Sequence, residues 1–281
     1  MSLTKNRHLT ISIVSYSEPI EQLATAVFKI AVAIGEIPKA VPNISSKIII
    51  VDNRDTDYLK TGPFEKIRSR IKEFPCELAL IQGQGNVGYG KGHNLAFEEG
   101  VSGIHLYMNP DVEVEKETLK AGLIYLDDNP DVGMVSPFAV NGKRQREYLC
   151  KRYPSVCLFL LRGLNLELIR SIFTSALNRY EMRELPDESA TKSIPIVSGC
   201  FMLVRNKIIE RVNGFNPVYF LYFEDFDLSL RVSAISKIAY LPSMKIIHYG
   251  GNSASKGALH IFYFVRSAII FFSTHGWRWS I

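Results

Sequence analysis

Short apolar segments alternate with helical segments through the first half of this chain, and this alternation restricts the fold more than any other feature. Apolar, β-branched segments predict buried strands at residues 9–16, 47–51, 77–81, 104–108 and 132–136. Helical spacing of apolar residues predicts helices between them, at residues 19–34, 63–74, 93–100 and 114–127. Strands joined through helices lie parallel, with helices on both faces of the sheet. The predicted fold class is therefore α/β, Rossmann-like, with a mostly parallel central sheet.

Polar residues lie at the carboxyl ends of four of the predicted strands. They are Ser15, the pair Asp52 and Asn53, a glycine-rich stretch at residues 83–92, and the segment from Asn109 to Asp111. Ligands of open α/β sheets bind outside the carboxyl ends of the strands. We therefore expect these four polar elements to share one binding site.

The pattern changes in the second half of the chain. Short strands are predicted at residues 194–197, 200–204, 238–241 and 245–248, and helices at 206–212, 223–234 and 257–275. We expect one half at residues 1–140, a smaller half at 141–255 with a helical insertion at about 154–190, and an amphipathic C-terminal helix within 256–281. The insertion is either a helical pair that covers the sheet or a surface that faces an acceptor or a membrane.

Charge and cysteine usage exclude some classes of protein. The net charge of +5 suits phosphate-bearing ligands or an anionic membrane, but it is too small to predict nucleic-acid binding. The four cysteines have no metal-type spacing, which favours reduced thiols in a cytosolic protein. The N-terminus has no apolar signal-peptide core, and the apolar run at 258–272 is interrupted by His260 and Arg266. We expect a cytoplasmic protein, with peripheral contact to the inner face of the membrane left open.

Gly83, Gly85 and Gly88 form a G-x-G-x-x-G pattern between a strand and a helix, with Asp111 about twenty residues further on, as in dinucleotide-binding folds. The pattern follows the third strand, however, whereas dinucleotide-binding folds carry it after the first. An NAD-dependent oxidoreductase would also leave the chain after residue 190 unexplained. This class of enzyme therefore stays as the less favoured alternative.

Glu224 and Asp225 lie in the first turn of the helix predicted at 223–234, where they follow the aromatic residues Phe220, Tyr222 and Phe223. Acids at a helix N-terminus are often ordinary surface residues that the helix dipole favours. Acids packed among aromatic rings have a raised carboxyl pKa instead, which makes them usable bases near neutral pH. Asp227 and Arg231 have the i, i+4 spacing of a structural ion pair.

Asp111 and His248 are the candidate metal ligands. Asp111 follows a strand, where its carboxylate could hold a divalent cation that bridges the two phosphates of a nucleotide; a turn or a helix N-cap is the alternative. His248 ends a strand before a glycine turn, as a metal or phosphate ligand or as a structural histidine.

Six segments in this order resemble the family 2 glycosyltransferases of GT-A fold, and among them the bacterial rhamnosyltransferases of O-antigen and related polysaccharide assembly. The resemblance spans roughly residues 9–255 and is carried by residues 51–53, 86–90, 106–111, 198–205, 214–215 together with 224–228, and 248. It implies that residues 1–140 bind a sugar nucleotide and that residues 141–255 bind the acceptor and carry the catalytic base.

The resemblance also implies roles for single residues. Asp225 would be the general base, Glu224 would orient the acceptor or the loop, and Asp111 and His248 would bind Mg²⁺ or Mn²⁺. The donor-binding positions would be Ser15, Asp52, Asn53, Asn86, Gly88, Asn94 and Asn109. Asn109 replaces the first acid of the family's D-x-D motif, so only one carboxylate of that motif remains.

The activity that the resemblance implies is an inverting, metal-dependent hexosyl transfer. The favoured donor is deoxythymidine diphosphate-rhamnose, with a UDP-sugar as the alternative. The acceptor would be a saccharide or a lipid-linked saccharide of a bacterial surface polysaccharide.

Overall fold

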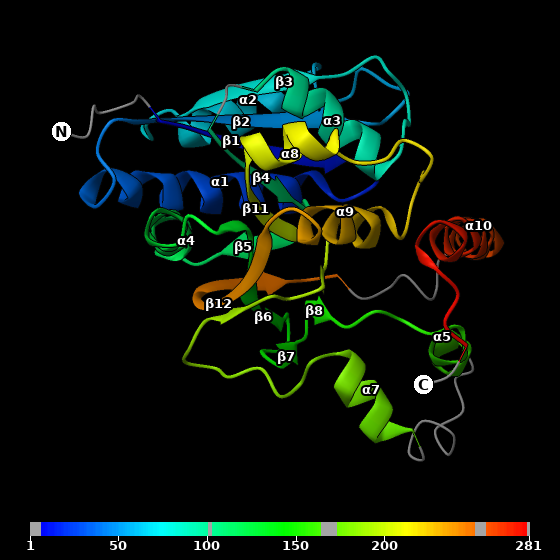
Figure 1. The fold of residues 1–281 in the computed structure, drawn as a ribbon. Coiled ribbons are helices and arrows are strands. Elements are labelled where there is room, and N and C mark those ends of the chain that lie inside the picture. Colours follow the sequence, from blue (N-terminus) through cyan, green and yellow to red (C-terminus); the bar gives the residue numbers. More distant parts are fainter. Residues whose placement is uncertain (1–6, 101–102, 164–172, 251–256, 280–281) are drawn as a thin grey trace.

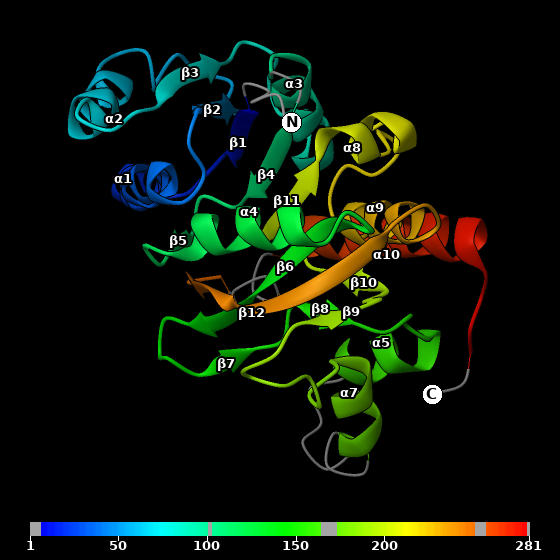
Figure 2. The same cartoon turned by 60° about the vertical axis from the view of Figure 1, so that its left-hand side comes forward.

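The computed structural model describes residues 7–100, 103–163, 173–250 and 257–279, and the side chains of these residues except at 160–163. One large sheet crosses the molecule, with helices on both of its faces (Figures 1 and 2). Its strand order is β3-β2-β1-β4-β11-β6-β12-β5, with β7 beside β6 and β9 beside β12. The fold class is therefore the predicted α/β class with a mixed, mostly parallel sheet.

The first part of this sheet is parallel. Here β1 (Arg7–Ser15) pairs with β2 (Ile44–Asp52) and β4 (Ile104–Met108), while β3 (Glu77–Ile81) pairs with β2. All four strands end at one edge, because parallel strands run in the same direction. Ser15 and Asp52 are direct partners in the register.

Strands from later in the chain complete the sheet. β11 (Phe201–Arg205) lies antiparallel between β4 and β6 (Val132–Asn141). β12 (Lys237–His248) runs parallel to β6 and antiparallel to β5 (Val112–Val114). The short strands are β7 (Arg146–Glu147), β8 (Cys150–Lys151), β9 (Thr191–Lys192) and β10 (Ile196–Val197), of which β8 and β10 form a separate pair.

Two apolar cores cover the two faces of the sheet. On one face pack α1 (Ile20–Glu36), α2 (Pro63–Ile71) and α4 (Thr118–Asp128), and η1 (Ile37–Lys39) follows α1. On the other pack α3 (Tyr89–Glu98), α8 (Asn206–Val212) and α9 (Glu224–Ser233). A third, aromatic cluster joins α9 to α10 (Ala258–His275) and α5 (Val156–Gly163), and α7 (Thr174–Tyr180) follows in the predicted insertion. Residues 164–172 of that insertion lie outside the described part of the chain.

Three sequence-based predictions were wrong in detail. The helix predicted from residue 93 begins at Tyr89, and the helix predicted from residue 114 begins at Thr118, because Val112–Val114 pairs with β12 as a strand. The two strands predicted around Pro242 are one strand, in which a register shift between Leu241 and Lys245 accommodates the proline.

Candidate active site

Ser15 and Asp52 lie side by side at the carboxyl ends of β1 and β2, and both are fully buried. Arg54 bridges them: its Nε donates to Asp52 Oδ1 at 2.8 Å and its Nη2 to Ser15 Oγ at 2.9 Å. The second carboxylate oxygen of Asp52 is buried and has no hydrogen-bond partner among the described residues. The pair is therefore a ready acceptor for a donor group of a ligand. Arg54 is not among the predicted site residues, and its position two residues beyond a strand end is its only signal in the sequence.

The glycine-rich loop closes over this edge of the sheet. Asn53 Nδ2 donates to the Gly88 carbonyl at 3.1 Å, and the Gly88 N–H donates to Asn86 Oδ1 at 3.1 Å. Gln84 Nε2 donates to the carbonyl of Asp52 at 2.8 Å. The structure thus brings together Asn53, Asn86 and Gly88, which had been predicted as donor-binding residues.

Asn94 has a different partner. Its Nδ2 donates to the Phe215 carbonyl at 2.8 Å, and its Oδ1 accepts the Phe215 N–H at 2.9 Å. The amide therefore joins α3 to the segment that leads into α9. A contact between Asn94 and a donor stays a prediction.

Asp111 and His248 meet because β5 pairs with the end of β12. The Tyr249 N–H donates to the Asp111 carbonyl at 2.9 Å, and His248 Nε2 lies 3.6 Å from Asp111 Oδ1. His248 Nδ1 lies 2.8 Å from Glu147 Oε2 on β7. Burial lowers the pKa of His248, but the Glu147 hydrogen bond and the charges of Asp111 and Glu147 outweigh it, so the net pKa is raised. Glu147, 101 residues away in sequence, gave no sequence signal.

A divalent cation fits this pair of side chains. Asp111 Oδ1 is buried without a hydrogen-bond partner in the described part of the chain. A Cβ atom on Gly250 would lie 2.5 Å from His248 Nε2 and 3.0 Å from Asp111 Oδ2, so only glycine leaves both side chains room there. The described residues contain no group of three or more His, Cys, Asp or Glu side chains that could hold a metal. Two protein ligands suit Mg²⁺ or Mn²⁺ if substrate phosphates supply the others.

Asn109 lies on the same loop as Asp111 and is half-buried. Its main-chain N–H donates to the Cys200 carbonyl at 2.9 Å, which ties the loop to the start of β11. A contact of its side chain with a donor stays a prediction.

The acid pair begins α9. Tyr222 and Phe223 have φ angles of 69° and 67°, so two bulky residues take left-handed backbone directly before the acids. Asp225 Oδ2 accepts the Gly199 N–H at 2.8 Å, and Oδ1 accepts the Phe226 N–H at 2.9 Å. Strained backbone and two N–H donors thus hold the Asp225 carboxylate in one orientation.

The two acids differ in exposure and in pKa. Asp225 is half-buried, and burial raises its pKa to about 6 although the N–H donors of Gly199 and Phe226 lower it. Glu224 is only 5% exposed, and burial, with the charge of Asp225, raises its pKa to about 8. At neutral pH the structure therefore offers one ionised, reachable carboxylate beside a protonated, buried one.

Gly199 and Cys200 connect the acid pair to the Asp111 loop, because the Gly199 N–H donates to Asp225 Oδ2 and the Cys200 carbonyl accepts the Asn109 N–H. The Tyr89 hydroxyl donates to the Gly199 carbonyl at 2.6 Å. The pKa of Tyr89 is raised first by burial and then by nearby charges that include Asp225 and Asp111. The same two aspartates, after burial, raise the pKa of Cys200. The predicted base and the predicted metal ligands therefore lie around one region.

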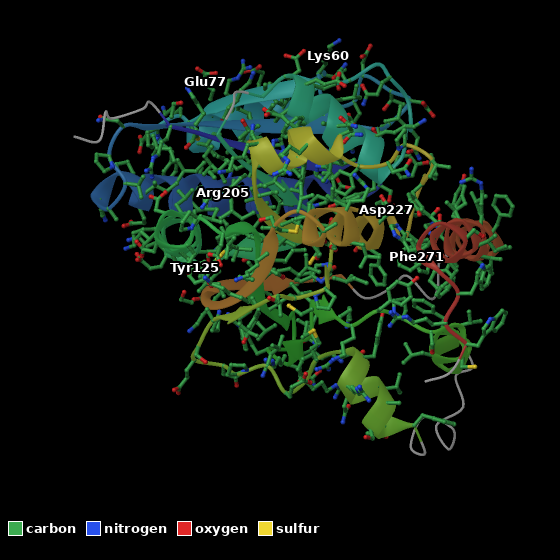
Figure 3. All side chains as sticks on the ribbon, in the orientation of Figure 1. Lys60, Glu77, Tyr125, Arg205, Asp227 and Phe271 are labelled. Atoms are coloured by element: carbon green, nitrogen blue, oxygen red, sulfur yellow. The ribbon has the colours of Figure 1, made fainter. Side chains whose placement is uncertain are left out.

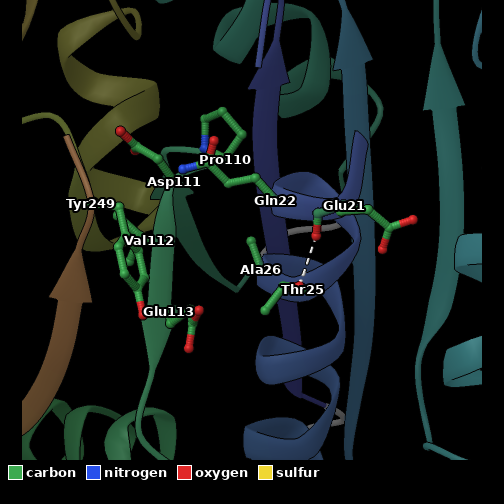
Figure 4. A pocket seen from close by; sticks show the side chains of 9 residues that line it. All are labelled: Glu21, Gln22, Thr25, Ala26, Pro110, Asp111, Val112, Glu113 and Tyr249. Carbon is green, nitrogen blue, oxygen red and sulfur yellow. Dashed lines mark hydrogen bonds between the residues drawn. The ribbon is translucent and has the colours of Figure 1, made fainter. Parts of the chain in front are cut away.

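A cavity of about 360 Å³ lies next to Asp111, between α1 and β5 (Figure 4). Its lining comprises Glu21, Gln22, Thr25, Ala26, Pro110, Asp111, Val112, Glu113 and Tyr249. Among the predicted site residues only Asp111 lines it, so this cavity borders the site without containing the acid pair.

The sequence profile of Glycosyl transferase family 2 matches residues 11–212, and the chain belongs to this family of glycosyltransferases. This overturns the dehydrogenase alternative. The glycine pattern follows the edge strand β3, whereas dinucleotide-binding folds place it after the first strand.

Two bacterial relatives carry similar sequences. The chain is 28% identical to "Rhamnosyltransferase WbbL" of Escherichia coli K12 over 72% of each chain. It is 25% identical to "N-acetylglucosaminyl-diphospho-decaprenol L-rhamnosyltransferase" of Mycobacterium tuberculosis, over 83% of this chain and 79% of that protein.

Solved structures share the GT-A fold. GalNAc-T7, solved with UDP, GalNAc and Mn²⁺, superposes with a TM-score of 0.61 at 12% identity over 86% of this chain and 43% of that one. Staphylococcus aureus TarS 1-349 in complex with UDP-GlcNAc gives 0.52 at 16% identity over 89% of this chain and 61% of that one. The chain thus spans less than two thirds of either structure.

Proposed function

We propose that this glycosyltransferase transfers a hexosyl group, with L-rhamnose favoured, from a nucleoside diphosphate to a saccharide acceptor of a bacterial surface polysaccharide, with inversion. The observation that carries the chemistry is the Asp225 carboxylate, fixed by the Gly199 N–H beside the region that Asp111 borders. The rhamnosyl group and the polysaccharide acceptor are supported by the names of the two bacterial relatives.

The reaction would be a single displacement. Asp225 accepts the proton of the acceptor hydroxyl while the hydroxyl oxygen forms a bond to the anomeric carbon, and the bond to the nucleoside diphosphate breaks on the opposite side. A second carboxylate that could attack the sugar would give retention. Glu224 is protonated at neutral pH and is buried, which supports inversion.

The donor would lie along the carboxyl edge of the sheet. The free oxygen of Asp52 can accept an N–H or O–H from the base or ribose, and the loop around Asn86 and Gly88 covers it. The TarS and GalNAc-T7 structures hold uridine nucleotides, so a UDP-sugar remains the second candidate donor.

Asp111 and His248 would hold Mg²⁺ or Mn²⁺, with Glu147 orienting the imidazole through Nδ1. The cation would supply positive charge next to the departing diphosphate.

Transfer assays with Asp225→Asn test the proposal. The amide keeps an oxygen that can accept the Gly199 N–H but cannot take a proton, so we expect kcat to fall about 10²–10⁴-fold while donor affinity stays within about twofold. In the wild-type enzyme kcat should rise with pH through about 6, where Asp225 ionises.

The exposed Asp128→Asn on α4 serves as the matched control, with wild-type kcat expected. The same assay compares deoxythymidine diphosphate-rhamnose with UDP-GlcNAc, each with Mn²⁺ and with EDTA. Wild-type turnover by Asp225→Asn would remove this residue from the chemistry, and turnover of neither donor by the wild type would contradict the proposed function.

A further inference from the structure

Exposed apolar side chains gather at the C-terminal helix. Seven of the twelve large apolar side chains that are exposed in the described part of the chain belong to α10 or follow it directly. They are Leu259, Ile261, Phe262, Val265, Ile269, Trp277 and Trp279, with exposed fractions between 44% and 66%. In Figure 1 α10 lies at the outer edge of the molecule, beyond α9. This apolar ridge is therefore open to whatever lies beside the protein.

The opposite face of α10 is bound to the catalytic half of the molecule. Ser267 Oγ donates to the Leu221 carbonyl at 2.8 Å, and His275 Nε2 lies 2.8 Å from Asp227 Oδ1. Phe271 and Phe272 are buried against the aromatic cluster that includes Phe223 (Figure 3 labels Asp227 and Phe271). The helix thus anchors the segment that leads into Glu224 and Asp225.

By length and hydropathy alone α10 could cross a membrane, and among the described residues it is the one helix that is long and apolar enough to do so. The helix is 18 residues long and includes His260 and Arg266, the two residues that interrupt its apolar run. A spanning arrangement would strip the buried Asp227 carboxylate, 1% exposed, of its bond to His275. The contacts therefore favour a helix that lies flat, with one face toward lipid and the other toward protein.

The charged residues near the ridge indicate what kind of surface it contacts. The 54 residues after Asp227 contain no Asp or Glu, so α10 and the tryptophans that follow it carry no acid of their own. Arg266 and Arg278 are exposed next to the ridge. The two tryptophans at the C-terminal end of α10 are the residue type that concentrates at membrane–water interfaces. The apolar ridge, its two exposed arginines and the interfacial tryptophans together match an anionic lipid surface.

We propose that the outer face of α10, with Trp277 and Trp279, lies in the interfacial layer of an anionic membrane and docks the enzyme there. The inference deepens the proposed function: a lipid-linked acceptor would present its sugar at the same surface, next to the segment that α10 holds before Asp225. The competing explanation is that a second copy of the chain packs on the same ridge, and the test distinguishes this dimer from membrane docking.

Tryptophan fluorescence reports on the ridge directly, since the chain has two tryptophans and both lie in it. We expect a blue shift and quenching by bromine-labelled acyl chains when the full chain meets phosphatidylglycerol–phosphatidylcholine vesicles, and co-flotation with them. Purely zwitterionic vesicles should bind at least about tenfold more weakly, since each basic residue near an anionic surface contributes about 1 kcal/mol.

The double variant Phe262→Asp, Ile269→Asp places two charges on the ridge and should reduce vesicle binding at least about tenfold. Ile124→Asp on α4, 38% exposed in the wild type, is the matched control and should bind like the wild type. Far-UV circular dichroism and turnover of a water-soluble acceptor show that both variants are folded.

Three results would overturn the proposal. They are unchanged fluorescence and no flotation, carbonate-resistant insertion of α10, and a concentration-dependent dimer that the double variant abolishes. Vesicle binding needs no turnover, so a wild-type enzyme that transfers to a soluble acceptor but binds no vesicles contradicts the docking alone. Docking without any transfer activity contradicts the proposed function alone.

Discussion

Glu224 and Asp225 are neighbours in the chain, yet they meet different surroundings. Asp225 has two main-chain N–H donors and is half-buried, while Glu224 Oε2 is buried with no partner in the described residues. Burial therefore costs Glu224 more in its ionised form, and its pKa rises further. The aromatic context indicated raised pKa values, but it could not show which acid remains reachable.

The raised pKa of Glu224 makes a prediction about stability. Its pKa is higher in the folded state, so the free energy of unfolding falls as pH rises from about 4.5 to about 8. Glu224→Gln removes this dependence. Relative to the wild type, its unfolding free energy should rise by roughly 2–4 kcal/mol between pH 5 and pH 8, at about 1.4 kcal/mol per pKa unit.

Urea denaturation of both proteins at pH 5, 6.5 and 8 measures this difference. Glu65→Gln, at a side chain that is 63% exposed, is the control and should follow the wild-type dependence. If the free energy of unfolding changed equally with pH in Glu224→Gln and in the wild type, Glu224 would be ionised in the folded protein and the prediction would be wrong.

Helix α3 shows how packing overrides local preference. Gly90 and Gly92 disfavour a helix, so the sequence predicts a start at residue 93, yet α3 begins at Tyr89. A Cβ on Gly90 would lie 2.9 Å from Phe215 Cβ, and one on Gly92 would lie 2.9 Å from a methyl carbon of Val14. The glycines let the helix approach β1 and the Phe215 segment, and this close packing offsets their low propensity.

Gly88, directly before α3, should tolerate no side chain. Its φ is 88°, and a Cβ there would lie 2.3 Å from the Phe220 carbonyl oxygen, which accepts the Tyr89 N–H. Gly88→Ala should therefore push the donor loop away from the segment before α9. We expect it to destabilise the protein by about 1–3 kcal/mol and to raise KM for the donor.

Gly83→Ala is the control that separates the clash with Phe220 from backbone strain. Gly83 also has a positive φ, of 91°, but a Cβ atom there would have no neighbour within 4 Å. Thermal or urea unfolding and donor KM are compared for the two variants. Equal effects of the two substitutions would mean that the Phe220 contact carries no energy.

The sheet unites both predicted halves of the molecule. β11 and β12 come from the second half, yet β11 lies between β4 and β6, and β12 pairs with β6. In a fragment of residues 1–140, β6 would lack both of its neighbours, β11 and β12, and β4 would lack β11. That residues 1–140 bind the donor and residues 141–255 bind the acceptor stays a prediction. Neither half contains a complete sheet.

A fragment of residues 1–140 should therefore fail to fold as a stable unit. Unpaired strand edges and exposed apolar faces favour aggregation. We expect no cooperative thermal transition by far-UV circular dichroism for the fragment, and one transition for the full chain. A fragment that melts cooperatively would indicate an independent nucleotide-binding domain.

The local sequence pattern was sufficient to predict most helices and strands and some of the residues of the candidate site. The predicted segments at 77–81, 104–108 and 206–212 coincide with β3, β4 and α8, because buried apolar runs and helical spacing are properties of neighbouring residues. Asp111, Asp225 and His248 could be named because Asp111 follows a predicted strand, His248 ends one, and Asp225 lies in the first turn of a predicted helix. Arg54 on Ser15, Glu147 on His248 and Gly199 on Asp225 could not, since these bonds join residues 39, 101 and 26 positions apart. Such contacts depend on strand order and register, which arise from packing of the whole sheet and leave no signal in any single segment.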